Sequence, residues 1–287
     1  MSTSKHHEIP DGVTSFIGKG ELPALRIETE FSTAEIYLHG AHVTHFQLKG
    51  EAPMLFMSDA SDFHLEKPIR GGVPIIFPWF GARDGMAAHG FARLAEWDLQ
   101  QASVLPNGSI QLNFRMPADD QFEVDFIVTV GRSLGMELIV TNNGSSDFTF
   151  ETCLHTYFQI GEIEKIKVNG LHGVRYRDQV LGTEFTENEP VIGFNAETDR
   201  VYQDTAATVE ILDPVLRRTI RIHKSGSKST VVWNPWILKS QRMPDFGDTE
   251  YLKMVCVESG NVRENSTTLA PGERSSLKVE LENTPMA

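Results

Sequence analysis

The chain has 287 residues, enough for one large β domain or two modest domains with a substantial core. Its apolar share of 40% and charged share of 23% are ordinary for a globular protein, and no apolar run approaches the roughly 20 residues of a membrane helix. The net charge of −13 argues against a broad nucleic-acid or anionic-membrane surface, because the field of the whole molecule repels polyanions. A small anion could still bind through a local cluster of arginines.

The N-terminal stretch MSTSKHHEIPDG is polar and lacks the apolar core of a secretory signal, so we expect a cytoplasmic protein. Cys153 and Cys256 are too few for a disulfide scaffold and form no C-x-x-C pair, so we expect two free thiols. The first ten or so residues and the last few are expected to be loose.

Strand periodicity begins early in the chain and predicts strands at 24–29, 34–38 and 42–48. The next segment, IRGGVPIIFPWFG at 69–81, is strongly apolar but contains Pro74 and Pro78. Neither a regular helix nor a long central strand accommodates these two prolines. We therefore expect an irregular segment at this point.

Two hairpins follow. SVLPNGSIQLNF at 103–114 has two extended runs around Asn107-Gly108, which is a strong hairpin signal. The segment 121–144 shows the same pattern, with a turn near Gly131 to Gly135. Further strands are predicted at 146–153, 166–168, 206–212, 218–223, 229–233, 252–258 and 276–282.

This density of short strands, with few helix signals, predicts an all-β, mainly antiparallel protein and favours a large sandwich over a small barrel. No segment has the composition of an interdomain linker, and no internal repeat is evident. We expect a single domain over residues 1–287, with its core at about 20–283.

Two strand segments carry residues capable of acid–base chemistry. In ETCLHTYFQIG, at 151–161, an extended chain turns Cys153, His155 and Tyr157 to one face. His155 is either a hydrogen-bonded core histidine or a functional one. In MVCVESGNV, at 254–262, Glu258 ends an apolar strand, so it lies either in solvent at the strand end or in a cleft that uses its proton affinity.

Loop-rich regions supply further candidates. HGFARLAEW, at 89–97, contains His89 and Arg93, for which a turn histidine and a solvated arginine are the simpler interpretations. ETDRVYQD, at 197–204, contains Asp199, and acidic loop residues are usually just solvated.

Other chemistries are not indicated. His39, His42 and His45 are spaced by three, which turns strand residues to opposite faces, so we expect no metal site there. The sequence has no phosphate-cradling glycine-rich loop and no Gly-x-Ser-x-Gly elbow, which argues against nucleotide chemistry and against a serine hydrolase.

Several motifs in one order resemble the aldose 1-epimerase (mutarotase) superfamily, and more narrowly its hexose-6-phosphate mutarotase branch, also called glucose-6-phosphate 1-epimerase. The resemblance covers about residues 20–283. The motifs are IRGGVPIIFPWFG, HGFAR, ETCLHTYF, ETDRVY, VVWNPW, MVCVESGNV and LAPGERSSLKVEL.

The resemblance implies the galactose mutarotase-like fold, a β-supersandwich of mainly antiparallel strands with an open cleft. It implies interconversion of the α and β anomers of a sugar by acid–base ring opening and reclosure. No metal, nucleotide or redox cofactor is expected, and the expected partner is a small sugar phosphate. We expect a monomer that binds neither nucleic acid nor a membrane.

The resemblance also assigns roles to individual residues. Glu258 would be the base and His155 the acid. Arg70 and Arg93 would bind the phosphate, since guanidinium groups bind phosphate bidentately. Asp199 would contact sugar hydroxyls.

His89 would line the cleft, by the same resemblance. Gly71 and Gly72 would let the backbone approach the ligand, and the apolar run after them would anchor Arg70. One departure is Ala88, where this branch often has glutamine, which puts fine specificity in doubt.

Two alternatives stay open at this point. One is a mutarotase for unphosphorylated aldoses, in which Arg70 does not hold a phosphate. The other is a non-catalytic carbohydrate-binding module, although the presence of both His155 and Glu258 argues against a protein that only binds.

Overall fold

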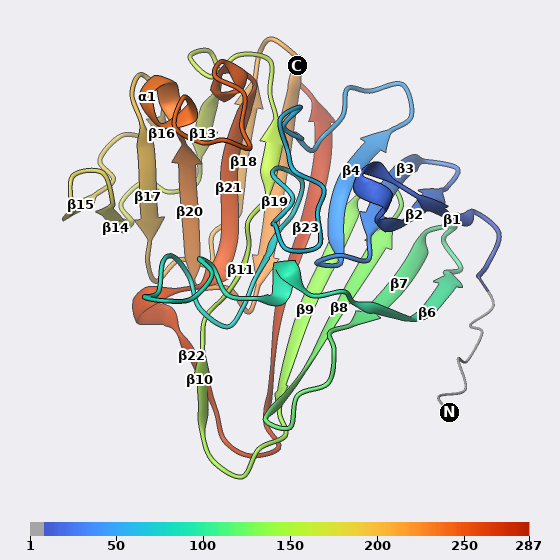
Figure 1. The fold of residues 1–287 in the computed structure, drawn as a ribbon. Helices are drawn as coiled ribbons and strands as arrows, with labels where there is room; N and C mark the ends of the chain where they lie inside the picture. Colours follow the sequence, from blue (N-terminus) through green and yellow to red (C-terminus); the bar gives the residue numbers. More distant parts are fainter. Residues whose placement is uncertain (1–8, 287) are drawn as a thin grey trace.

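Twenty-three strands form four antiparallel sheets in the computed structural model, which describes residues 9–286 (Figure 1). The strands are β1 Val13–Ile17, β2 Pro23–Glu28, β3 Ser32–Tyr37, β4 His42–Leu48, β5 Ile75–Ile76, β6 Asp98–Val104, β7 Ile110–Arg115, β8 Phe122–Val130, β9 Leu134–Asn142, β10 Phe148–Phe150, β11 Thr152–Leu154, β12 Tyr157–Gln159, β13 Lys167–Asn169, β14 Arg175–Asp178, β15 Thr183–Thr186, β16 Val191–Ile192, β17 Thr198–Tyr202, β18 Val209–Asp213, β19 Arg218–Ser225, β20 Ser229–Asn234, β21 Met254–Asn261, β22 Thr267–Leu269 and β23 Arg274–Pro285. The mainly antiparallel all-β architecture predicted from the sequence is confirmed.

Helix is scarce among the described residues. It consists of α1, Trp236–Ser240, and four short 3-10 turns at Lys19–Glu21, Ala92–Leu94, Glu250–Lys253 and Arg263–Asn265. No helix in this part of the chain has the length and apolar character needed to cross a membrane.

Two large sheets pack face to face. One has nine strands in the order β16-β13-β18-β19-β23-β9-β8-β7-β6, and the other has eight, in the order β15-β14-β17-β20-β21-β11-β5 with β12 also paired to β21. Val232 and Val257 of the eight-stranded sheet share one buried core with Ile220 and Val279 of the nine-stranded sheet. Val231, Trp233 and Glu258 alternate with these core residues and lie on the other face of β20 and β21.

Two smaller sheets complete the architecture. The β1-β2-β3-β4 sheet contributes Ile27, Ala34 and Val43 to the same core, and β10 pairs with β22. This arrangement of layers is that of a sandwich extended at one end by an additional sheet.

The predicted hairpins are confirmed. β6 and β7 pair around a turn in which the Gly108 N–H donates to the Leu105 carbonyl, and Gly108 has a φ of +80° that favours glycine. β8 and β9 pair from Phe122 opposite Asn142 to Val130 opposite Leu134.

Eight strands were not among the ranges predicted from sequence: β1, β5, β12, β14, β15, β16, β17 and β22. All of them are five residues or shorter, and they alternate too few times for periodicity to reveal them. Asp199 consequently lies on β17 and not on a loop.

The C-terminal end differs from the expectation that the last few residues are loose. β23 continues to Pro285, which lies opposite Arg218, and the Met286 N–H donates to the Arg217 carbonyl. Residues 1–8 of the N-terminal stretch that was expected to be loose lie outside the described residues.

The segment 69–81 is irregular, as predicted, with only Ile75–Ile76 in strand conformation. Ile75, Ile76 and Phe77 are fully buried. The role expected for its two glycines is wrong, because a Cβ at Gly71 would meet the Phe56 carbonyl oxygen at 2.5 Å. A Cβ at Gly72 would meet the Val43 carbonyl oxygen at 2.3 Å. These glycines allow close approach of backbone to backbone, and neither lines the cleft described below.

Candidate active site

His155 and Glu258 lie directly opposite each other on paired strands. β11 and β12 pair with β21 in one continuous register, in which Leu154 faces Ser259. His155 follows in the gap between the two short strands, so the next facing pair is His155 and Glu258. The Nε2 atom of His155 lies 3.1 Å from Oε1 of Glu258.

The surroundings of this pair change the proton affinity of both groups. Their side chains are almost fully buried, with residue exposures of 8% for His155 and 1% for Glu258. Burial, assisted by the charge of Asp199, raises the pKa of Glu258 well above its ordinary value. Burial, assisted by His89 and Arg93, lowers the pKa of His155 well below its ordinary value. A stronger carboxylate base and a stronger imidazolium acid suit proton transfer.

The sequence context predicts that Glu258 ends its strand. The structure shows that this prediction is wrong. β21 continues to Asn261, because Ser259 pairs both with Leu154 of β11 and with Thr230 of β20. The Ser-Gly-Asn sequence is typical of turns, but strands on both sides hold it extended. The alternative of a solvent-exposed carboxylate at a strand end is therefore excluded.

Both thiols lie beside the pair. Cys153 and Cys256 are free thiols, as predicted, and the structure buries both. Cys153 Sγ lies 3.5 Å from Oε2 of Glu258. Cys256 Sγ, a ring nitrogen of His155 and a carboxylate oxygen of Glu258 all lie within 4.8 Å of one another, which makes these three the one group of potential metal ligands among residues 9–286.

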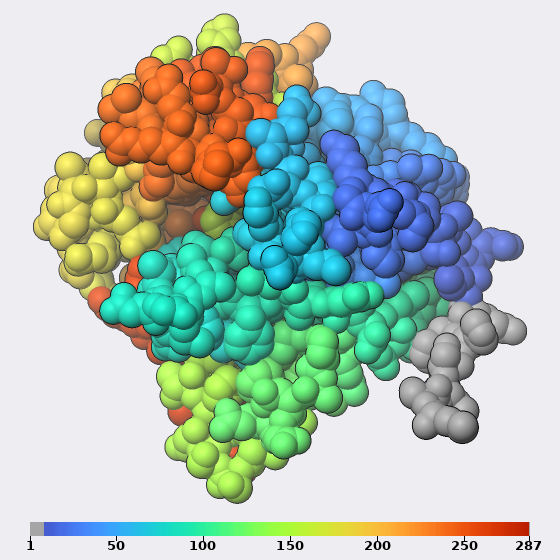
Figure 2. All heavy atoms as spheres, in the orientation of Figure 1, coloured from blue at the N-terminus to red at the C-terminus, as the bar shows by residue number. Residues whose placement is uncertain are grey.

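The pair lies at a cleft with a volume of about 550 Å³. In Figure 2 the surface is hollowed between the orange α1 region, the yellow β14–β15 region and the teal segment that follows residue 80. The lining residues are Arg70, Phe80, Gly81, Ala82, Ala88, His89, His155, Tyr157, Gln179, Asp199, Val231, Trp233, Lys239, Met243, Glu258 and Arg263.

The site extends from β21 across the neighbouring strands β20 and β17. Trp233 of β20 faces Cys256 on one side and Asp199 of β17 on the other. Gln179 donates to the Asp199 carboxylate over 2.9 Å, and Lys239 Nζ lies 3.6 Å from it. Asp199 and its neighbours thus present both donors and acceptors, the combination that sugar hydroxyls require.

Arg70 also lines the cleft, but its charge is already paired with that of Asp245. Its guanidinium donates to Asp245 Oδ2 at 3.1 and 2.9 Å, and to the Tyr157 hydroxyl at 2.9 Å. Burial alone would lower the pKa of Arg70, but Tyr157 and Asp245 together raise it above its ordinary value. No sequence motif pointed to Asp245.

Arg93 is a buried cation without an ion-pair partner among the described residues. It is 8% exposed, it donates to the Ala88 carbonyl at 2.7 Å, and its Nε atom has no hydrogen-bond partner. Burial and the charge of Arg70 lower its pKa to about 10. Arg93 lies behind the residues that line the cleft, close enough to influence the pKa values of His155 and His89.

His89 lies between the rings of Phe80 and His155. The centre of its ring is 5.0 Å from the centre of the Phe80 ring and 5.7 Å from that of the His155 ring. Its Nδ1 accepts the Gly81 N–H at 3.2 Å. Burial, followed by the nearby charge of Arg93, lowers its pKa to about 3. His89 is therefore neutral near pH 7 and carries its proton on Nε2, so it can donate to a ligand oxygen.

Arg263 is a cleft residue that the sequence did not single out, although it follows the MVCVESGNV motif directly. Its guanidinium donates to Gln179 at 3.2 Å and lies 5.5 Å from the centre of the Phe80 ring. Its φ of +57° is in the left-handed region, and its N–H donates to Glu151. Trp233 and Tyr157 were also missed as lining residues, although both stand within quoted motifs.

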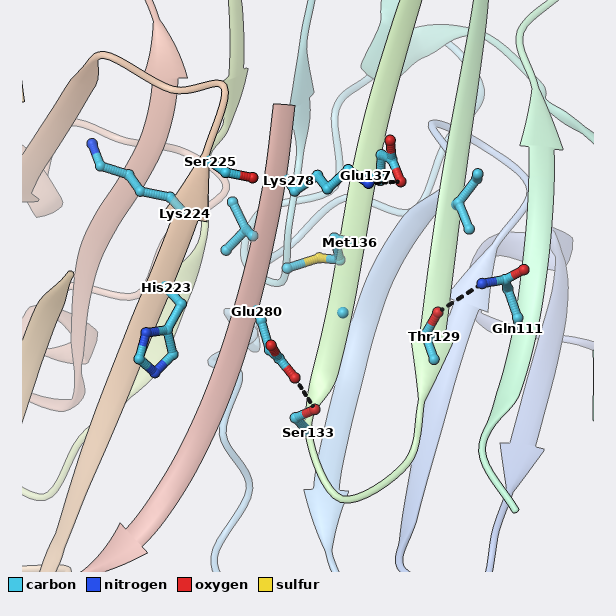
Figure 3. Close-up of a pocket in the computed structure, with 13 residues that line it drawn as sticks. Gln111, Thr129, Ser133, Met136, Glu137, His223, Lys224, Ser225, Lys278 and Glu280 are labelled. Atoms are coloured by element: carbon cyan, nitrogen blue, oxygen red, sulfur yellow. Dashed lines mark hydrogen bonds and ion pairs between the residues drawn. The ribbon is translucent and has the colours of Figure 1, made fainter. Parts of the chain in front are cut away.

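A second hollow, of about 440 Å³, lies on the opposite side of the nine-stranded sheet from the core, where side chains of β7, β8, β9, β19 and β23 project (Figure 3). Its polar groups bond to one another: Ser133 to Glu280, Gln111 to Thr129, and Lys278 to Glu137. Because these partners satisfy each other, these six side chains are not free for chemistry.

The histidines spaced by three, His39, His42 and His45, each bond to a different group. His39 and His42 contact the carbonyls of Lys67 and Gly71, and His45 lies 3.3 Å from the Thr33 hydroxyl. They do not form a ligand group within the described part of the chain.

Comparison with known proteins supplies the family. The family model for aldose 1-epimerase matches residues 23–282. A protein of Cenchrus ciliaris with the provisional name glucose-6-phosphate 1-epimerase is 35% identical over 269 residues, which cover 88% of this chain and 82% of the relative.

Two solved structures share the fold. A crystal structure from Salmonella typhimurium, provisionally described as a mutarotase, superposes with a TM-score of 0.89 at 28% identity and covers 97% of this chain and 96% of its own. A galactose mutarotase-like protein from Clostridium acetobutylicum has a TM-score of 0.72 at 14% identity, with 96% and 98% covered, which bears on the fold alone. The galactose mutarotase-like fold predicted from the sequence is confirmed, and the chain belongs to the aldose 1-epimerase family of isomerases.

Proposed function

We propose that the protein interconverts the α and β anomers of a hexose 6-phosphate, with glucose 6-phosphate as the first substrate to test. The observation that carries the proposal is the 3.1 Å contact between His155 and Glu258 in the cleft, close to the unpaired charge of Arg93. The Cenchrus ciliaris relative, named for glucose 6-phosphate, supports the choice of sugar.

The reaction needs one base and one acid. Glu258 accepts the proton of the anomeric hydroxyl while His155 donates a proton to the ring oxygen, so the bond between C1 and the ring oxygen breaks and an open-chain aldehyde forms. Rotation about the C1–C2 bond and the reverse proton transfers close the ring as either anomer. Each positioned group supplies about 10²–10⁴-fold in rate.

Two arginines are proposed to bind the phosphate. Arg93 has a desolvated charge that no carboxylate neutralises in the described structure, and Arg70 presents a guanidinium fixed by Asp245 and Tyr157. A phosphate would restore the partner that Arg93 lacks, and charge-assisted bonds of this kind are among the stronger ones in proteins.

The phosphate would also assist the chemistry. Positive neighbours, including Arg93 and Arg70, help to lower the pKa of His155. A phosphate dianion at the arginines offsets that field and favours the protonated imidazolium that donates to the ring oxygen. We therefore expect a higher kcat for glucose 6-phosphate than for glucose, in addition to a lower KM.

The sugar itself is proposed to contact Asp199, His89 and the side chains around them. Asp199 accepts from sugar hydroxyls, and the Nε2–H of His89 donates to a sugar oxygen. Ala88 lines the cleft with a methyl group where a glutamine side chain would add hydrogen-bonding capacity, so selectivity among hexose 6-phosphates depends on the other lining residues.

The substrate proposal is tested with an Arg93→Gln variant in an NMR anomer-exchange assay. Loss of a charged hydrogen-bond partner costs about 1.5–3 kcal/mol, so kcat/KM for glucose 6-phosphate should fall by roughly 10- to 150-fold. The fall for glucose should be much smaller. Equal falls for the two sugars would remove Arg93 from the phosphate site.

A mutarotase for unphosphorylated aldoses is the second candidate, and it has one observation in its favour. The charge of Arg70 is already paired with Asp245, which leaves fewer free positive charges for a phosphate. Wild-type protein that exchanges glucose or galactose faster than glucose 6-phosphate would support this candidate. Binding of either sugar without exchange would indicate a carbohydrate-binding module.

The proposal includes a monomeric, cytoplasmic enzyme that needs no metal or other cofactor. Size-exclusion chromatography with light scattering gives the mass directly. A mass of two or more chains would contradict the monomer.

A further inference from the structure

Cys256 is a thiol beside the proposed catalytic pair that the ring-opening reaction does not use. It is fully buried, and it stands two residues before Glu258 on the same side of β21. Its Sγ, a ring nitrogen of His155 and a carboxylate oxygen of Glu258 lie within 4.8 Å of one another. A nitrogen, a sulfur and an oxygen donor are therefore gathered at one point, where His155 and Glu258 line the cleft and Cys256 lies buried beside them.

Paired strands hold the three donors in place. Cys256 lies opposite Tyr157 on one side and opposite Trp233 on the other, in the middle of the eight-stranded sheet. His155 and Glu258 face each other two positions along from Tyr157 and Cys256, so they lie on the same side of the sheet. Sites built on rigid strands keep their ligand atoms close together without an ion to organise them.

This set of donors selects a class of metal ion. Zinc sites that admit a further ligand have three protein ligands, drawn from imidazole, thiolate and carboxylate groups, and an open fourth position. The open position faces the cleft, because His155 and Glu258 both line it. Calcium and magnesium prefer oxygen ligands and more of them, so the site disfavours both.

The distances allow such an ion after a small adjustment. Bonds of about 2.0–2.3 Å around a tetrahedral zinc place its ligand atoms roughly 3.3–3.8 Å apart. His155 Nε2 and Glu258 Oε1 are already 3.1 Å apart. The widest separation, at most 4.8 Å, closes with a side-chain movement of about 1 Å.

We propose that His155, Cys256 and Glu258 form a binding site for a divalent cation of the zinc class, and that the bound cation inhibits the enzyme. On binding, the Cys256 S–H bond breaks, its proton leaves to solvent and an S–metal bond forms, with no change of oxidation state. The proton between His155 Nε2 and Glu258 Oε1 also leaves, to solvent or to His155 Nδ1. Lone pairs of Glu258 and His155 Nε2 then also bind the metal. Neither group can transfer a proton to or from the sugar in that state.

The inhibitory part of this proposal rests on the proposed function, but the binding part does not. Cobalt(II) takes tetrahedral zinc sites and gives a sulfur-to-metal charge-transfer absorption when a thiolate binds it. Titration of the full chain with cobalt(II) should give that band, saturating at one ion per chain. Addition of zinc should abolish the band.

The chain offers a matched pair of variants. Cys256→Ser removes the proposed thiolate and should abolish the charge-transfer band. It should also weaken zinc binding and zinc inhibition by about tenfold or more, since even outer partners of metal ligands contribute 10–100-fold to affinity. Cys153→Ser changes a second buried thiol, 3.5 Å from Glu258 but outside the ligand group, and should retain the band.

Three outcomes would overturn the inference. The first is that the wild-type chain gives no charge-transfer band. The second is that the band survives in Cys256→Ser but not in Cys153→Ser. The third is that zinc binds at the site without slowing anomer exchange. Exchange activity without the band contradicts this inference alone. A band that behaves as expected in a chain without exchange activity contradicts the proposed function instead.

Discussion

Glu258 is a carboxylate that the fold buries with an imidazole and a thiol as its polar contacts. A buried carboxylate without a cationic partner is costly, and the cost appears as a raised pKa. Structural carboxylates in this chain are treated differently: Asp245 and Glu187, for example, are paired with Arg70 and Arg200. The contrast supports the role proposed for Glu258.

At the residue scale, a Tyr157 variant can distinguish the packing role of the ring from the role of the hydroxyl in positioning the phosphate. Its ring stacks on His155 with centroids 4.9 Å apart, and its hydroxyl accepts a hydrogen bond from Arg70. Tyr157→Phe keeps the ring and loses the bond, worth about 0.5–1.5 kcal/mol, so KM for glucose 6-phosphate should rise roughly 2- to 10-fold while kcat changes little. A steady-state exchange assay measures both constants. A fall in kcat with an unchanged KM would contradict the positioning role.

At the scale of elements, the site depends on two short strands and one irregular segment. β11 and β12 keep one register on β21 across their interruption, which brings His155 opposite Glu258. The segment 69–81 passes beside them: the His155 N–H donates to the Pro74 carbonyl, and the Tyr157 N–H donates to the Gly72 carbonyl. The segment thus closes the backbone hydrogen bonds of the interrupted strand, which anchor it beside the site.

Gly72 tests this anchoring. It has a φ of +58°, and a Cβ there would meet the Val43 carbonyl oxygen at 2.3 Å, so Gly72→Ala should lower the free energy of unfolding by at least about 3 kcal/mol. Gly50 also has a positive φ, but nothing lies within 4 Å of its Cβ position. Gly50→Ala should therefore lose only about 1–2 kcal/mol in urea denaturation. Equal losses would show that the close approach at Gly72 does not matter.

The sequence predicted the hairpins and the long strands, because alternation over six or more residues and an Asn-Gly turn are local signals. It did not predict that Glu258 lies within a strand, because neighbouring strands impose that conformation on a turn-like sequence. It also did not predict Asp245, which reaches Arg70 only through tertiary folding. Local residue types and motifs are visible in a sequence, whereas their long-range partners are not.

At the scale of the whole molecule, a chain of net charge −13 concentrates positive groups at one cleft. Arg70, Lys239 and Arg263 line it, and Arg93 lies behind them. Such local attraction acts over a short range in salt, so it can select a small anion without making the surface basic.

Buried histidines give the molecule a defined response to acid. Burial lowers the pKa of His42 to about 3, whereas the unfolded chain protonates near 6.5, so stability present above pH 6.5 is lost as the pH falls toward 3. The contribution of His42 should fall by about 2 kcal/mol between pH 7 and pH 5. Glu258 acts in the opposite direction, because its folded pKa is raised, so the effect of His42 must be isolated by mutation.

Urea denaturation of wild type and His42→Gln at both pH values isolates the effect. The free energy of unfolding of wild type minus that of the variant should shrink by about 2 kcal/mol from pH 7 to pH 5. A difference that does not change with pH would mean that His42 titrates alike in the folded and unfolded chain.

The central claim is that Glu258 and His155 open and close the ring of a hexose 6-phosphate. NMR magnetisation transfer between the α and β anomers of glucose 6-phosphate measures it directly, with circular dichroism to establish that Glu258→Gln keeps its fold. Wild-type protein should accelerate exchange, and Glu258→Gln should lose about 10²–10⁴-fold of that rate. A folded Glu258→Gln variant that exchanges the anomers at the wild-type rate would contradict the account.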